Sequence, residues 1–135
     1  MMDLVQRSLD ASALSHKVIA NNIANVDTPG FKRAEVVFSD KLKRALEARQ
    51  NAGDSLELAR TDARHLSLED AEDVDSVRPE VVTDITSSLR NDGNNVDIDH
   101  EVSLLSQNTV WYQTLAQITK SQFTDLMSAV HEGRR

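Results

Sequence analysis

The sequence contains no cysteine, only two prolines and four glycines, and 4% aromatic residues. Without cysteine, the chain has no disulfides, no thiolate nucleophile and no cysteine-ligated metal. Aromatic side chains supply much of the packing area in most enzyme cores, so their scarcity argues against a compact enzyme. Glycine and proline interrupt helices, so their scarcity predicts a mainly helical chain. The length of 135 residues suits a single domain with a modest core.

Long hydrophobic runs are also missing. No apolar stretch approaches the roughly 20 residues that span a bilayer. Asp3, Arg7 and Asp10 interrupt the first ten residues, where a secretory signal would need a continuous apolar segment. If the protein leaves the cytoplasm, we expect it to do so without a cleavable signal. The net charge of −7 disfavours partners such as nucleic acid and anionic membranes.

Charge is concentrated in the middle of the chain. Residues 32–101 hold 17 acidic and 10 basic residues, whereas residues 1–31 and 102–135 hold five charged residues each. We therefore expect three segments: an N-terminal helix with its closing turn in 1–31, a charged middle region in 32–96, and a C-terminal helix in 97–135. The acidic stretch 69–75 predicts a solvated loop.

The C-terminal segment has the clearest periodicity. Apolar and small residues recur there at alternating spacings of four and three, the heptad pattern of a left-handed coiled coil. This predicted seam consists of Ile98, Val102, Leu105, Thr109, Tyr112, Ala116, Thr119, Phe123, Leu126 and Val130. A weaker stripe beside it contains Leu104, Trp111, Leu115 and Ile118. No charged residue occurs from 103 to 119, which is typical of a helix with neighbours on several sides. Asp97 or Asp99 is expected to cap the helix, with Glu101 in its first turn.

The N-terminal segment repeats this spacing more weakly. Its seam consists of Met2, Val5, Leu9, Ser12, His16, Ile19, Ile23 and Val26. Pro29 and Gly30 are expected to end the helical region in a turn. Because the seam contains a serine and a histidine, we expect the two terminal helices to pair with each other or with neighbouring subunits. Neither is expected to be stable alone.

The middle region predicts a short helix and a small β element. Phe38, Leu42, Ala45 and Leu46 favour a helix that starts at Ser39 or Asp40 and ends near Gly53. Residues 74–77 and 81–85 could form short strands, and residues 91–94 (Asn-Asp-Gly-Asn) predict a turn.

Three asparagines close the N-terminal helical pattern, although asparagine is a poor helix former. They lie in the segment Ala-Asn-Asn-Ile-Ala-Asn-Val-Asp-Thr-Pro-Gly-Phe-Lys at residues 20–32. Asn21 and Asn25 share a helix face, where their amides can pair with backbone groups of the turn or of another chain. From the residues alone, a polar helix end and an interaction motif are equally good interpretations of this segment.

This segment strongly resembles the N-terminal signature of the flagellar axial family, the rod and hook proteins. Residues 93–102, followed by Asn108 and Tyr112, resemble the second signature of that family. The short middle region and the Asn-Asn-Val-Asp sequence at residues 94–97 are most similar to proximal rod members. Thr61 and the His65–Leu66 pair resemble a short motif of that subtype. Asp27 and Phe31 depart mildly from the usual asparagine and tyrosine.

The resemblance implies a structural subunit of the basal-body rod, whose terminal helices pair as a coiled coil and polymerise into an axial shaft containing the export channel. It implies export through the flagellar type III apparatus, without cleavage, to the periplasmic side of the cytoplasmic membrane. Expected partners are other rod subunits, the ring-base adaptor, the export apparatus and further copies of the chain. The expected assembly interface comprises Leu9, Ile19, Asn21, Asn22, Ile23, Asn25, Val26, Pro29, Gly30, Val102, Leu105, Tyr112, Phe123 and Leu126.

Other functions have weaker support. No histidine pair has metal-ligand spacing, and the cluster Asp97, Asp99 and Glu101 lacks the loop of an EF-hand, so we expect no metal, cofactor, small-molecule substrate or catalytic residues. A chaperone or adaptor of the export system would also be small, acidic and helical, but the asparagine-rich segment argues against it. A self-contained enzyme is disfavoured by the charge-poor ends. Another rod subunit is the nearest alternative, whereas a hook subunit would need a large middle domain.

Overall fold

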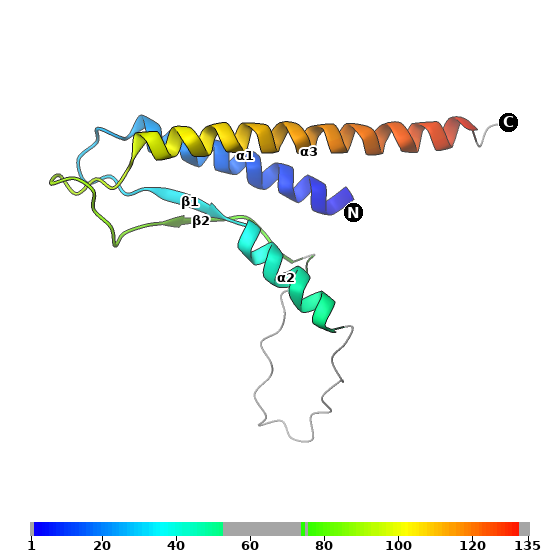
Figure 1. Ribbon diagram of the computed structural model, residues 1–135, viewed down its shortest axis with the longest axis horizontal. Helices are drawn as coiled ribbons and strands as arrows, with labels where there is room; N and C mark the ends of the chain where they lie inside the picture. Colours follow the sequence, from blue (N-terminus) through cyan, green and yellow to red (C-terminus); the bar gives the residue numbers. More distant parts are fainter. Residues whose placement is uncertain (1, 53–73, 75, 133–135) are drawn as a thin grey trace, which may run out of the picture. The chain divides into compact units, whose positions relative to one another are not determined.

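The computed structural model describes residues 2–52, 74 and 76–132. It contains α1 (Met2–Ala24), β1 (Ala34–Val37), α2 (Ser39–Ala52), β2 (Glu80–Thr83) and α3 (Ile98–Glu132) (Figure 1). The predicted fold class is confirmed: the chain is mainly helical, its long terminal helices pack together, and a small β element lies between them in sequence. None of the described helices is long and apolar enough to cross a membrane. The predicted acidic loop (apart from Val74), Thr61 and the His65–Leu66 pair lie outside the described residues.

Two compact units make up the chain. The first contains the segment up to Val36 and the segment from Pro79 onward, and the second contains Val37–Arg78. In the second unit, α2 begins at Ser39, has Asp40 in its first turn and continues to Ala52, as the sequence predicts. Phe38, Ala45, Val74 and Val77 are its buried apolar residues.

In the first unit, α1 and α3 run antiparallel, as Figure 1 shows. The Ser12 hydroxyl donates to Asn108 Oδ1 over 2.8 Å, and Asn22 Nδ2 donates to Glu101 Oε2 over 3.0 Å. The higher-numbered residue of α1 therefore meets the lower-numbered residue of α3. With 35 residues against 23, α3 is the longer helix.

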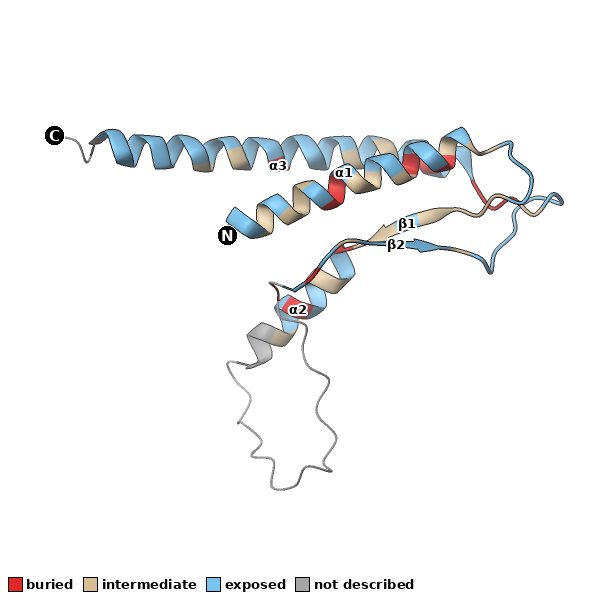
Figure 2. Ribbon diagram, turned by 180° about the vertical axis from the view of Figure 1, so that it is seen from behind, coloured by how far each residue is buried: buried red, intermediate tan, exposed pale blue. Residues whose placement is uncertain are grey.

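The face of α3 that contacts α1 differs from the predicted seam by one row. Glu101 and Leu115 are buried, and Asn108 and Gln122, on the same heptad row, are half-buried. This row replaces Val102, Thr109, Ala116 and Phe123, which are exposed. Most of α3 is exposed, as Figure 2 shows. In the second predicted row, Leu105 and Thr119 are half-buried, whereas Tyr112 and Leu126 are exposed. Hydrophobicity could not identify the first row because three of its four members are polar.

The contacting face of α1 agrees better with its predicted seam. Ser12 and Ile19 are buried, and Leu9, Ile23 and Val26 are half-buried. His16 is exposed, contrary to its predicted place on the seam. Asn22, rather than the neighbouring Ile23, is the buried residue at this end of the helix.

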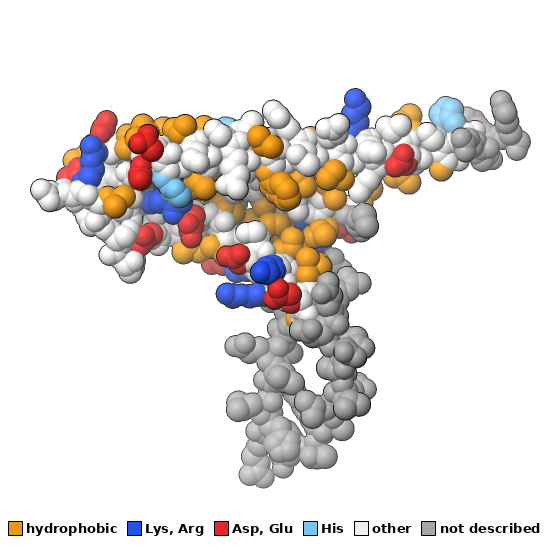
Figure 3. Space-filling view, viewed as in Figure 1, with side chains coloured by type: hydrophobic (Ala, Val, Ile, Leu, Met, Phe, Trp, Pro, Cys, Tyr) orange, Lys and Arg blue, Asp and Glu red, His pale blue; other side chains and the backbone are white. Residues whose placement is uncertain are grey.

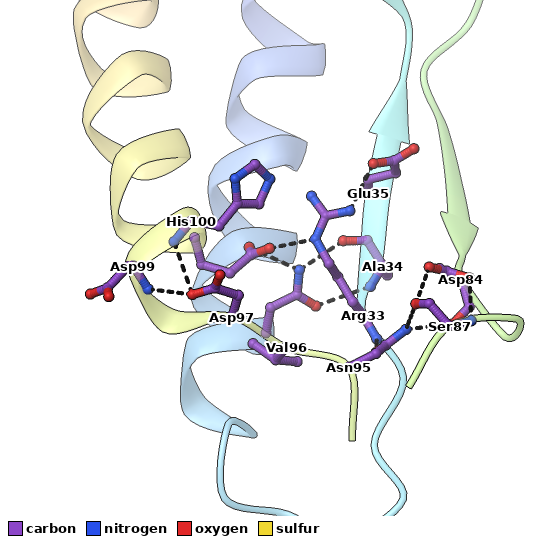
Figure 4. A network of polar contacts seen from close by, with 12 residues as sticks. Arg33, Ala34, Glu35, Asp84, Ser87, Asn95, Val96, Asp97, Asp99 and His100 are labelled. Atoms are coloured by element: carbon purple, nitrogen blue, oxygen red, sulfur yellow. Dashed lines mark hydrogen bonds and ion pairs between the residues drawn. The ribbon is translucent and has the colours of Figure 1, made fainter. Parts of the chain in front are cut away.

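The two strands form an antiparallel pair, whose arrows point in opposite directions in Figure 4. The predicted strand at 81–85 is confirmed by β2. The prediction of a strand at 74–77 was wrong, because Val74 and Ser76 lie in turns and Val77 in irregular structure. The partner of β2 is instead β1, which follows the turn at residues 25–30 closely in sequence. The Asp84 amide extends the pairing by donating to the Arg33 carbonyl over 2.8 Å.

Glycine is required in both turns that flank the sheet. Gly30 has φ 73° and Gly93 has φ 83°, a region that other L-residues rarely adopt. The Gly30 amide donates to the Asp92 carbonyl over 3.0 Å, so the turn after α1 is joined to the turn before α3. The predicted turn at 91–94 is confirmed.

Candidate functional site

The start of α3 is fixed by Asp97. Its Oδ1 accepts hydrogen bonds from the amides of Asp99 (3.0 Å) and His100 (3.3 Å), the geometry of a helix N-cap. Of the two predicted caps, the structure selects Asp97. Capping holds the first turn of α3 in place, where Glu101 is bonded to Asn22 of α1 and to Arg33, just before β1.

Glu101 is fully buried and accepts a hydrogen bond at each carboxylate oxygen. Arg33 Nε donates to Oε1 over 2.6 Å, and Asn22 Nδ2 donates to Oε2 over 3.0 Å. A buried carboxylate is costly unless it is paired in this way. These three residues come from α3, the residues just before β1, and α1, so one carboxylate joins three segments.

Arg33 is held by two carboxylates. Besides the bond to Glu101, its Nη1 lies 2.9 Å from Glu35 Oε2. Partial burial lowers the pKa of Arg33, but the hydrogen bonds and negative charges of Glu101 and Glu35 raise it by more. The pKa therefore lies above the ordinary value, and the guanidinium remains charged at any physiological pH.

Asn22 connects α1 to β1 through both ends of its amide. Its Nδ2 donates to the Ala34 carbonyl over 2.7 Å, and the Ala34 amide donates to its Oδ1 over 3.1 Å. The side chain is only 1% exposed. A carboxamide in this position makes the two hydrogen bonds that a neighbouring strand would make with Ala34.

Asn95 connects the segment before β1 to the segment that follows β2. Its Oδ1 accepts from the Arg33 amide over 2.6 Å, and its Nδ2 donates to the Asp84 carbonyl and the Ser87 hydroxyl, each over 2.9 Å. The Asp84 carboxylate in turn accepts from the hydroxyls and amides of Ser87 and Thr86, and these hydrogen bonds lower its pKa well below the usual range.

Asn94 closes the turn after α1. Its Nδ2 lies within 3.0 Å of three carbonyl oxygens, those of Asn25, Val26 and Thr28. Its Oδ1 accepts from the Val96 amide over 2.7 Å. The residue is completely buried. The two segments that resemble family signatures are therefore bonded to each other within one chain.

Asn21 and Asn25 lie together on the other face of α1, as their spacing predicts. Asn25 Nδ2 donates to the Asn21 carbonyl (2.9 Å) and to Asn21 Oδ1 (2.8 Å). The Thr28 hydroxyl donates to Asn25 Oδ1 over 3.2 Å. Asn21 is exposed and Asn25 half-buried, so this pair stabilises the turn while leaving polar groups at the surface. Pro29 and Gly30 are also exposed.

A second feature is the uncovered apolar surface of α3. Val102 (48% exposed), Tyr112 (45%), Phe123 (52%) and Leu126 (54%) belong to the predicted interface, and Trp111, Met127 and Val130 are also exposed. Figure 3 shows hydrophobic side chains along α3, separated mostly by uncharged polar ones. Leu126 lies on the same row as Leu105 and Thr119, whereas Phe123 and Val130 lie on the adjacent row with Val102, so the exposed apolar surface lies beside the face that packs on α1.

The described residues do not form a metal-binding cluster. No group of three histidine or acidic residues among them could hold a metal ion. Asp97 and Glu101, two of the acidic residues considered as calcium ligands, instead cap a helix and pair with Arg33. His16, His100 and His131 are all exposed.

Sequence reasoning missed Arg33, Asn94 and Asn95 as organising residues, and it treated Glu101 only as a favourable charge near a helix start. Asn22 was expected at an assembly interface, and the structure places it inside the chain. No local signal distinguished Glu101, because Asp97 and Asp99 belong to the same acidic cluster at the start of the helix.

Comparisons with known proteins show which family the chain resembles. The family model described as "Flagella basal body rod protein" matches residues 9–32, which include most of α1 and the turn that Asn94 closes. The protein named "Flagellar basal body rod protein FlgB" from Borrelia hermsii is 41% identical over 90% of this chain and 89% of its own length. Proteins of the same name from Bacillus subtilis (32% identical; 96% and 92% covered) and Escherichia coli (28%; 95% and 91%) also match.

These matches span both helices and the segments that join them. The chain belongs to the FlgB family of flagellar basal body rod proteins.

Proposed function

We propose that this chain is a structural subunit of the proximal rod that polymerises through its terminal helices into the axial drive shaft around the export channel, and that it catalyses no reaction. Its partners would be further copies of the chain, other rod subunits, the ring-base adaptor and the export apparatus. It would reach the periplasmic side of the cytoplasmic membrane through the flagellar export apparatus without a cleavable signal.

The observation that carries this proposal is the exposed apolar surface of α3. Phe123, Leu126, Met127 and Val130 are each more than half exposed, within a few turns of one helix. Contiguous apolar surface of this kind marks interaction sites in soluble proteins. This surface lies beside the face that packs on α1, so a helix from a neighbouring subunit could pack against it in the same way.

The absence of charge along the helix supports the same function. Residues 103–119 of α3 carry no charged side chain, and many are exposed in the single chain. Uncharged polar residues can be buried and hydrogen-bonded at lower cost than lysine or glutamate. A helix surrounded by neighbours in a tube would have this composition.

The proposal is tested by placing charges on the exposed apolar surface of α3. The double variant Phe123→Asp/Leu126→Asp, expressed in a strain that lacks its own copy of the gene, should be made and exported but should be absent from basal bodies. Motility should be lost, because two carboxylates would be buried without partners in the assembled rod.

Ser121→Asp/Ser128→Asp is the matched control. It adds the same charge at two exposed polar positions of α3 and is expected to leave the cells motile. Both variants should retain the helix content of the wild-type chain in circular dichroism. Motility of the Phe123→Asp/Leu126→Asp strain at the wild-type level would refute the proposed interface.

A further inference from the structure

The contact between α1 and α3 contains two polar layers. In the first, the Ser12 hydroxyl donates to Asn108 Oδ1 (2.8 Å) and Asn108 Nδ2 donates to the Ser12 carbonyl (3.0 Å). In the second, Asn22 and Glu101 are bonded over 3.0 Å and Arg33 completes the carboxylate's partners. Ser12, Asn22 and Glu101 are all nearly or fully buried.

Apolar packing alone gives these helices little information about their axial position. Glu101, Asn108 and Leu115 lie seven residues apart on the row of α3 that faces α1. A shift of one heptad would move each of them onto the place of the next, about 10 Å along the axis. If all three were leucine, the shifted and unshifted pairings would be nearly equivalent.

The polar residues make the shifted pairings unequal. After a shift in one direction, Leu115 would lie opposite Ser12, whose hydroxyl would lose its acceptor, and Glu101 would lose both Asn22 and Arg33. A buried carboxylate without partners is strongly unfavourable, whereas the paired carboxylate is tolerated. Single buried polar positions are known to fix register in coiled coils for this reason.

We propose that the layers Ser12–Asn108 and Asn22–Glu101–Arg33 determine the axial register of α1 on α3. This inference concerns the single chain and holds whether or not the proposed assembly does. A consequence for the assembly rests on the proposed function. There, the same register would fix the axial position of the exposed apolar surface of α3 relative to the turn at residues 25–30.

The experiment measures the register directly by electron paramagnetic resonance. The chain has no cysteine, so Lys17→Cys on α1 and Gln113→Cys on α3, both exposed, provide two unique spin-label sites. These labels are offset along the helix axis, so a slip changes their distance. Dilution with unlabelled protein removes distances between chains. The full chain with native layers should give one narrow distance.

In this labelled chain, Glu101→Leu/Asn108→Leu makes the facing row leucine at three successive heptad positions. The helices should stay paired, and the distance distribution should broaden or gain a second population displaced by up to about 10 Å. The control Ser103→Leu/Gln117→Leu adds two leucines at exposed positions of α3 and should keep the single distance.

A single unchanged distance in Glu101→Leu/Asn108→Leu would overturn the proposal and assign the register to the turns instead. If that variant loses helix content in circular dichroism, the same distance is measured in Glu101→Ala/Asn108→Ala instead. Alanine removes both layers without adding bulk and favours helix. A broadened or displaced distance distribution between the two labels would support the proposal, and the native distribution would overturn it.

Discussion

Asn22 and Ala34 exchange two hydrogen bonds, 2.7 Å and 3.1 Å long, between a helix side chain and the backbone of a strand. Through them the last turn of α1 is attached to β1, and the same amide reaches Glu101 on α3. Asn22, a residue of the signature segment 20–32, therefore joins α1, β1 and α3.

Asn22→Ala should destabilise the folded chain by about 3 kcal/mol, because it leaves several buried polar groups without partners. These are the amide and carbonyl of Ala34 and one oxygen of Glu101. Urea denaturation followed by circular dichroism would measure the change. Asn21→Ala, at the exposed neighbouring position, should change the free energy of unfolding by less than about 0.5 kcal/mol. Equal effects of the two substitutions would show that the buried contacts contribute little.

Arg33→Leu should also destabilise the chain, by about 3 kcal/mol, since it leaves the fully buried Glu101 carboxylate without its cationic partner. Lys43→Ala removes an exposed ion pair with Glu47 in α2, whose atoms are 3.9 Å apart, and should cost less than about 0.5 kcal/mol. The same denaturation measurement compares the two. An Arg33 variant as stable as the wild type would mean that Glu101 is satisfied by Asn22 alone.

The stability contributed by Asp84 should depend on pH. Hydrogen bonds from Ser87 and Thr86 lower its pKa in the folded chain below the unfolded value of 3.8. A lowered folded pKa contributes stability above the unfolded pKa, and this contribution is lost as the pH falls toward the folded pKa. Asp84→Asn should therefore be less stable than the wild type at pH 7, and the difference should shrink below about pH 4.

Asp125→Asn makes the same change in net charge at an exposed position of α3 and tests for a general charge effect. Thermal unfolding at several pH values from 7 to 3 would compare both variants with the wild type. A difference between Asp84→Asn and the wild type that stays constant over this range would contradict the role given to the hydrogen bonds of Asp84.

The helices were largely predictable because their signals are local. Ser39 and Asp40 start α2, Asp97 caps α3, and heptad spacing identifies both terminal helices. The turns at Gly30 and Gly93 were predictable from residue types that favour positive φ. The strand β1 was missed because its pairing partner β2 is distant in sequence, on the far side of α2.

The candidate site was only partly predictable. Hydrophobicity selected the row of α3 with Val102 and Phe123, which the single chain leaves exposed, rather than the polar row with Asn108 that packs on α1. Both rows follow the same heptad spacing, and nothing local distinguishes an apolar row that meets another chain from one that meets α1. Asn22 and Glu101 are far apart in sequence, so their contact could be found only in the folded chain.

We expect the exposed apolar face of α3 to be covered in the assembled rod. Hydrogen exchange of α3 peptides covering residues 119–131 measures this coverage in the soluble chain and in purified basal bodies. Exchange should be rapid in the soluble chain, where this end of the helix has little packing, and strongly slowed in the basal body. Equal exchange in both states would contradict this expectation, because the face would then remain uncovered after assembly.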